Sequence, residues 1–193
     1  MANMCSNTIY FCSTNKEVLE RFMDTVQDGD SYQKLFMKNG YTEKEAMEHC
    51  DGRDYITFCD YEITAREEGF YYFVVDTETA WDTHIETFHL LFKQKYDSEI
   101  FAYYCSEEPG FSIFVTNDGE KMFFEDRYRI SACETVYFPN KNELVEYIKE
   151  EYGVEVSIID SVDKMEKQVK AKMQEDNRHG YCTINKYDID MYG

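Results

Sequence analysis

Basic residues are scarce in this chain. It has 20 Lys and Arg among 193 residues, against 39 Asp and Glu, which gives a formal net charge of −19. Proteins neutralise nucleic-acid phosphates with Lys and Arg, so the excess of carboxylates argues against direct binding to nucleic acid. The hydrophobic fraction of 43% and the aromatic fraction of 17% suffice for a packed core, which argues against a disordered acidic tail.

Long apolar runs and a secretory signal are missing as well. No apolar run reaches the roughly 18 residues that a membrane helix needs. The N-terminal sequence MANMCSNTIY contains no basic region followed by an apolar core. The cysteines number seven, with no CxxC pair, which is typical of reduced structural thiols. These features predict a cytoplasmic protein with no membrane partner.

Motifs of common catalytic and cofactor sites are absent too. The sequence contains no GxGxxG, GxxxxGK(S/T) or GxSxG, which disfavours nucleotide-binding enzymes and serine hydrolases. We therefore expect no catalytic residue, no metal site and no cofactor. One alternative stays open, a metal- or small-ligand-binding enzyme or regulator. Its site would be the region of His84, His89, Asp82 and Glu86 or an aromatic pocket on the sheet, although the two histidines lack the i, i+4 spacing of ligands on one helix face.

Hydrophobic periodicity gives the order of the elements up to residue 105. It predicts strand, helix, strand, strand, helix and strand, at residues 8–12, 14–27, 55–63, 70–75, 83–96 and 100–105 in turn. Thr14 with Glu17, and Thr83 with Glu86, have the spacing of capping boxes at the two helix starts. This order is the βαββαβ plan. The predicted fold class is therefore α+β, a ferredoxin-like antiparallel sheet with extra strands and a C-terminal helical extension.

The predicted ferredoxin-like domain covers residues 1–130, with an insertion at about 28–54. Most of that insertion looks irregular, with a short helix at residues 41–50. Asn117-Asp118-Gly119 is a hairpin signal, expected to join a strand ending at Thr116 to a strand over residues 122–130.

Residues 131–193 form the predicted α/β extension. Apolar residues at helical spacing indicate one helix near residues 144–152 and another near residues 162–173, and a last strand is expected at residues 181–187. Neither helix carries enough apolar surface to stand alone, so both are expected to dock on the core of the main sheet.

Two stretches resemble motifs of a known family. The first is Ala2-Asn3-Met4-Cys5-Ser6-Asn7-Thr8, and the second is Phe73 to Trp81, followed by a helix and by Tyr103 to Gly110. Over about residues 1–27 and 70–125 the chain resembles the YubB-like family of ferredoxin-fold proteins, found largely on phages, plasmids and integrated elements. It departs from the family pattern at Met4, where Trp is usual, and at Asp82-Thr83-His84, where Ser-Pro-Pro is frequent.

This resemblance implies a ferredoxin-like fold and a protein that a mobile element deploys in a host cell. It supplies no active-site residues, because the family has no established set. The motif positions are expected to be structural, with Trp81 buried where the sheet meets the helix.

The negative charge is concentrated in two blocks. Residues 40–69 hold nine acidic and three basic residues, and residues 97–120 hold six acidic residues and no basic one. In the predicted topology both blocks border the hairpins and loops of the sheet, where they would form one negative surface. The expected contact residues on that surface are Glu62, Glu67, Glu68, Glu107, Glu108 and Asp118.

The leading hypothesis is a non-enzymatic protein-binding module of a phage or mobile element, located in the host cytoplasm. Its acidic face would dock on a basic host protein, such as a CRISPR effector or another defence nuclease, and occupy a groove meant for nucleic acid. Two further alternatives stay open: a structural homo-oligomer formed through sheet edges, and charge that serves solubility alone. RNA binding is disfavoured although Tyr71, Phe73, Phe101 and Tyr103 offer stacking rings, since residues 97–120 contain no Lys or Arg and no RNP-type motif appears.

Overall fold

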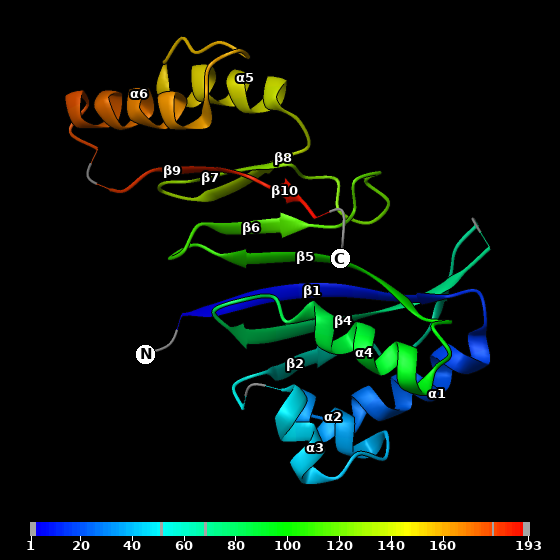
Figure 1. Ribbon diagram of the computed structural model, residues 1–193. Coiled ribbons are helices and arrows are strands. Elements are labelled where there is room, and N and C mark those ends of the chain that lie inside the picture. Colours follow the sequence, from blue (N-terminus) through cyan, green and yellow to red (C-terminus); the bar gives the residue numbers. More distant parts are fainter. Residues whose placement is uncertain (1–2, 51, 68, 179, 191–193) are drawn as a thin grey trace. The chain divides into compact units, whose positions relative to one another are not determined.

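The computed structural model describes residues 3–50, 52–67, 69–178 and 180–190 (Figure 1). The chain divides into a larger unit, Met1–Gly119 with Ile189–Gly193, and a smaller unit, Glu120–Asp188. Within the described ranges, no helix combines the length and the apolar character needed to cross a membrane.

The larger unit has a ferredoxin-like sheet at its centre. Its strands run in the order β10-β6-β5-β1-β4-β2, and β3 also pairs with β4 (Figure 1). The central four strands, β5-β1-β4-β2, are all antiparallel, and α1 and α4 follow the first and third of them in the chain, which is the βαββαβ plan predicted from the sequence. The elements are β1 (Met4–Ser13), α1 (Lys16–Gln27), α2 (Tyr32–Lys38), α3 (Glu43–His49), β2 (Tyr55–Cys59), β3 (Thr64–Ala65), β4 (Tyr71–Ala80), α4 (Ile85–Lys95), β5 (Phe101–Glu108), β6 (Ile113–Thr116) and β10 (Asp188–Ile189).

Phe11 lies at the centre of the larger unit's core. Successive residues of a strand point to opposite faces, and Phe11 lies on the face that the helices cover. Its ring centroid is 5.0 Å from that of Phe22 on α1, 4.9 Å from that of Phe88 on α4 and 5.5 Å from that of Phe73 on β4. One aromatic cluster therefore fixes both helices on the same side of the sheet.

The helix starts differ from the predicted capping boxes. The helix α1 is capped by Asn15, whose side chain accepts a hydrogen bond from the Val18 amide. The residue before α4 is His84, which has a left-handed backbone (φ +50°) and no side-chain cap. Thr14 and Thr83 share the chemistry of capping residues, but they lie one residue before the positions where the chain enters the helices.

The insertion between α1 and β2 is more ordered than predicted. It contains α2 as well as the predicted short helix, α3. A capping box does begin α3, because the Thr42 hydroxyl accepts from the Glu45 amide while the Glu45 carboxylate accepts from the Thr42 amide. The Tyr32 side chain of α2 is fully buried in the main core.

Asn117-Asp118-Gly119 does not form the predicted hairpin. The strand β6 pairs with β5 through a turn at Pro109-Gly110, and the residues after Gly119 belong to the smaller unit. The Asn117 side chain instead extends the β5 edge, where it accepts from the Tyr104 amide and donates to the Ala102 carbonyl, both at 2.8 Å.

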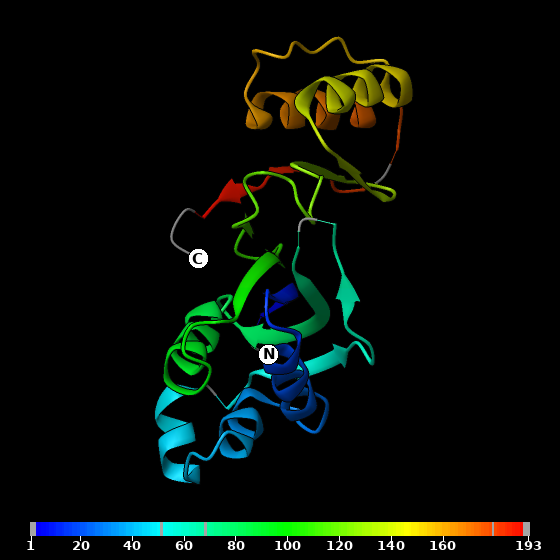
Figure 2. The ribbon, with the colours of Figure 1, turned by 90° about the vertical axis from the view of Figure 1, so that its right-hand side faces the viewer.

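The smaller unit has its own sheet and its own core. The strands pair in the order β8-β7-β9, and α5 and α6 lie side by side on one face of this sheet (Figures 1 and 2). The core contains Ile130, Leu144, Ile148, Met165 and Ile184. Its elements are β7 (Tyr128–Ser131), β8 (Thr135–Phe138), α5 (Lys141–Tyr152), α6 (Val162–Glu175) and β9 (Thr183–Lys186).

This arrangement corrects the predicted division of the chain. The boundary lies at Gly119, not at about residue 130, and Ile189 and Asp190 return to the larger unit. The two predicted helices and the last strand are present, but both helices pack on the second sheet rather than on the core of the main sheet. The β-strands at residues 128–138 supply the apolar face that the helices lacked when considered alone.

Candidate functional site at the polar end of the main sheet

The helix-covered face of the main sheet changes from apolar to polar along β1. Ile9 pairs with Val75 of β4 and with Tyr104 of β5, and all three are buried in the core. Closer to the beginning of β1, where β4 and β5 end (left side of the sheet in Figure 1), the rows become polar. Asn7 lies between Thr77 and Ser106, and Cys5 pairs with Thr79.

Asn7 organises this polar end. It is buried, and its amide donates to the hydroxyls of Thr77 at 3.1 Å and Thr79 at 3.0 Å. The buried Tyr32 hydroxyl donates to Thr77 at 3.0 Å. Ser106 Oγ, also buried, has no hydrogen-bond partner in the described part of the chain. Buried polar groups are costly unless they are paired, so the Asn7 network is a rigid connection between β1, β4 and α2.

A buried carboxylate holds the beginning of α4. His84 Nδ1 lies 2.8 Å from Asp54 Oδ1, and the Asp54 side chain is 1% exposed. The hydrogen bond with Asp54 raises the pKa of His84, against the opposing effect of burial. The other oxygen, Asp54 Oδ2, is buried and has no hydrogen-bond partner among the described residues.

Trp81 follows β4 and is exposed at this end of the sheet. Its backbone is left-handed (φ +73°), which is rare for a bulky residue. Its amide donates to the Asn3 carbonyl at 3.2 Å, and the Thr79 hydroxyl donates to the Asp82 carbonyl. The expected burial of Trp81 is wrong, since its side chain is 44% exposed. The left-handed backbone of Trp81 ends the alternation of buried and exposed side chains along β4, so the indole does not point into the core.

Phe111 meets the Trp81 ring from the next hairpin. The ring centroids are 5.4 Å apart at an interplanar angle of 67°, and Phe111 is 56% exposed. The Phe111 amide donates to the Glu108 carboxylate. A Cβ on Gly110 would lie 2.6 Å from Asn3 Nδ2 and 2.9 Å from Glu108 Oε1, so the hairpin fits closely against the chain's first described residue. We call the exposed surface of Trp81 and Phe111 the aromatic patch.

Two of the six sequence-predicted contact residues are buried and cannot belong to an exposed contact surface. Glu62 and Glu67 are exposed in the segment between β2 and β4, and Glu107 is partly buried on β5. Glu108 is buried because it binds the Phe111 amide, and Asp118 is fully buried. These two are corrections to the predicted surface. Glu68 lies outside the described residues.

One exposed carboxylate was missed by the sequence analysis. Glu78 of β4 and Glu107 of β5 pair with Ser6 of β1 from opposite sides, so they share one row on the face opposite the helices. The alternation of buried and exposed residues along β4 carries this signal, but the sequence analysis ended that strand at Val75.

The described residues offer neither a metal-binding cluster nor, among the buried cysteines Cys5, Cys12 and Cys50, a reactive thiol. No group of three or more His, Cys, Asp and Glu side chains there is arranged to hold a metal ion, including the region of His84 and His89. Burial raises the pKa values of the Cys5, Cys12 and Cys50 thiols to about 12, with the Asp54 charge adding to the effect on Cys50. Such thiols stay protonated near neutral pH and are poor nucleophiles.

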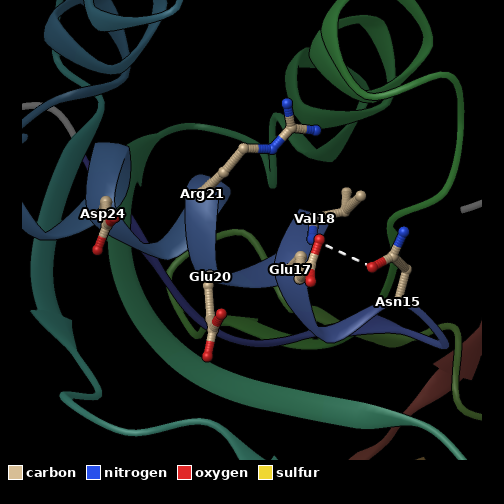
Figure 3. Close-up of a pocket in the computed structure, with 6 residues that line it drawn as sticks. All are labelled: Asn15, Glu17, Val18, Glu20, Arg21 and Asp24. Atoms are coloured by element: carbon tan, nitrogen blue, oxygen red, sulfur yellow. Dashed lines mark hydrogen bonds between the residues drawn. The ribbon is translucent and has the colours of Figure 1, made fainter.

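Three surface hollows lie among the described residues. The hollow shown in Figure 3 has a volume of about 470 Å³, and all of its lining residues come from α1 and its capping residue Asn15. A hollow of about 230 Å³ is lined in part by Asp54, and one of about 310 Å³ is lined in part by His84 and Cys50.

Comparisons with known proteins do not identify a family. No protein-family model and no curated protein matches the chain. A solved structure assigned as a glycine cleavage system transcriptional repressor is similar over 95% of this chain and 98% of that chain, with 9% sequence identity and a TM-score of 0.28. A likeness at that TM-score carries no argument about function, so the aromatic patch and its surroundings are interpreted from their own chemistry.

Proposed function

We propose that this chain is a protein-binding module whose contact surface is centred on the aromatic patch. The observation that carries the proposal is the exposed pair of Trp81 and Phe111. Exposed tryptophan is enriched among the residues that dominate protein–protein binding energy. The left-handed backbone of Trp81 also supports a functional role, because strained backbone of this kind is concentrated at functional sites.

The charge around the patch favours a basic partner. Residues 3–15, 76–92 and 97–120, which include this end of the sheet, contain no Lys or Arg. Burial raises the pKa of the Cys5 thiol, and the charges of Asp82, Glu108 and Glu107, in that order, add to this effect. Three carboxylates therefore lie around the beginning of β1. Complementary charge guides association and excludes wrong partners.

The biological setting of this proposal comes from the resemblance to mobile-element proteins. It suggests a host protein that binds nucleic acid, such as a CRISPR effector or another defence nuclease, in the cytoplasm. The acidic end of the sheet would compete with nucleic acid for the partner's basic groove.

Capture experiments with the full chain test the proposal. The tagged wild-type protein, Trp81→Ala and Phe111→Ala are each incubated with host lysate at physiological salt. Tyr181→Ala, which removes an exposed aromatic side chain from the smaller unit, is the matched control. We expect a basic protein that the wild type and Tyr181→Ala retain and the two patch variants lose.

Two outcomes oppose the proposal. Retention of every captured protein by Trp81→Ala and Phe111→Ala contradicts it, and so does capture of nothing by the wild type. Size-exclusion chromatography with light scattering examines the homo-oligomer alternative. A dimer that Trp81→Ala dissociates would assign the patch to self-association instead.

A further inference from the structure

We infer that the aromatic patch receives an arginine side chain of the partner. In this arrangement, which rests on the proposed function, the guanidinium stacks on Trp81 beside the carboxylate of Asp82. Such a site would recognise one particular group of a basic partner, the arginine guanidinium, and not its positive charge alone.

Cation–π contacts elsewhere in the protein support the inference. Lys95 Nζ lies 4.5 Å from the centroid of the Tyr41 ring, and the Arg178 guanidinium lies 5.7 Å from that of Tyr152. Over the described ranges, no Lys or Arg lies in this way over Trp81 or Phe111. Tryptophan is the best cation acceptor among the aromatic side chains, so the ring most suited to a cation lacks one.

The rings of Trp81 and Phe111 meet edge to face, and both residues stay largely exposed. At 67° the rings of Trp81 and Phe111 form a corner, so they do not cover each other as stacked rings would. A guanidinium is flat and weakly hydrated and stacks readily on an aromatic face, whereas an ammonium is compact and strongly hydrated. The corner therefore suits arginine better than lysine.

Asp82 supplies the second half of the site. It is exposed beside Trp81, and its Oδ1 accepts a hydrogen bond from the Thr83 amide at 2.7 Å, which orients the carboxylate. The donors of a guanidinium form a fork that matches a carboxylate. Because hydrogen bonds to Asn3 and Thr79 already hold the backbone of Trp81 and Asp82, little backbone ordering is needed on binding.

The chain's single tryptophan makes the patch directly observable. Since Trp81 is the only one, intrinsic tryptophan fluorescence of the full chain reports this site alone. The probes are short peptides of equal length that contain arginine, lysine or citrulline, the last being a neutral analogue of arginine with nearly the same shape. We expect saturable changes in fluorescence with the arginine peptide, about threefold or weaker binding of the lysine peptide, and none of the citrulline peptide.

Variants separate stacking from general charge attraction. Phe111→Ala and Asp82→Asn keep the fluorophore and are each expected to weaken binding of the arginine peptide by about three- to fivefold. Asp163→Asn removes one exposed carboxylate from α6 and is the matched control, with unchanged affinity expected. Far-ultraviolet circular dichroism confirms that each variant is folded. Trp81→Ala, measured by calorimetry, should lose the saturable binding.

Equal affinity for the arginine and lysine peptides, or equal loss in Asp82→Asn and Asp163→Asn, would overturn the inference. Either result would show attraction by net charge alone. If the peptides fail in this way while Trp81→Ala still abolishes partner capture, the protein-binding proposal stands and only the arginine assignment is wrong.

Discussion

His84 and Asp54 connect the beginning of α4 to the loop before β2 through one contact of 2.8 Å. His84 has a raised pKa because its charged form is stabilised by the buried carboxylate. The two residues are far apart in sequence, and neither belongs to a helix or a strand. The contact therefore fixes the segment that carries Trp81 and Asp82 between β4 and α4.

The stability of the protein should depend on the protonation of His84. A raised pKa in the folded state means that the contact contributes fully below the ordinary histidine pKa of 6.5, and that its contribution is lost as the pH rises through the higher pKa of the folded state. The free energy of unfolding in urea, measured from about pH 5.5 to 8.5, should therefore fall more steeply for the wild type than for His84→Gln. His89→Gln, on α4, is the control and should keep the wild-type slope. A His84→Gln profile parallel to the wild type would contradict this account.

Replacement of Asn7 should destabilise the larger unit strongly. In Asn7→Ala the hydroxyls of Thr77 and Thr79 lose a buried partner, at a cost of about 1–3 kcal/mol. Ser6→Ala changes the next residue of β1, which is exposed on the opposite face, and should change stability by no more than about 0.5 kcal/mol. Denaturant unfolding of both variants measures the difference, and equal effects would argue against the buried network.

Two phenylalanines should differ sharply in their contribution to stability. Phe11 is fully buried at the centre of the aromatic cluster, so Phe11→Ala should cost about 3–5 kcal/mol. Phe111→Ala should cost about 0.5 kcal/mol or less, because most of that side chain is already in solvent. If Phe111→Ala proves as destabilising as Phe11→Ala, the patch is part of the core and cannot serve as a free contact surface.

The two units should unfold separately, and each unit should be followed by its own spectroscopic signal. Trp81 is in the larger unit, whereas Leu144 is fully buried in the core of the smaller one. Leu144→Ala should lower the free energy of unfolding of the smaller unit by about 2–5 kcal/mol. The circular dichroism signal of α5 and α6 should therefore be lost at a lower temperature. The transition seen by Trp81 fluorescence should shift much less. Coincident shifts of both signals would show that the chain unfolds as one cooperative unit.

The sequence allowed the main sheet to be predicted because its pattern is local. Alternating β-branched and aromatic residues mark β1 and β4, and helical spacing of Val18, Leu19 and Phe22 marks α1. The second core was missed because each of its helices was considered without β7 and β8, which follow a segment that looks like a hairpin.

The candidate site was only partly predictable, for a different physical reason. The motif stretches around Asn3, Trp81 and Gly110 do meet at one end of the sheet. The exposure of Trp81 depends on a left-handed backbone that hydrogen bonds to distant residues hold in place. Likewise, Glu108 next to Pro109 looked like a solvated turn, and only the fold shows that its carboxylate caps the Phe111 amide.

The insertion of the smaller unit has a consequence for biosynthesis. β6 pairs with β10, and residues 117–187, which include almost all of the smaller unit, lie between these two strands in the chain. While the ribosome makes that stretch, β6 has an unpaired edge of the kind that invites association with other chains. Closure comes only when Asp190 has emerged, since its amide donates to the Thr116 carbonyl at 2.8 Å and its carboxylate accepts from the Tyr104 hydroxyl at 2.5 Å. Nascent chains halted before that point should be the aggregation-prone form of this protein.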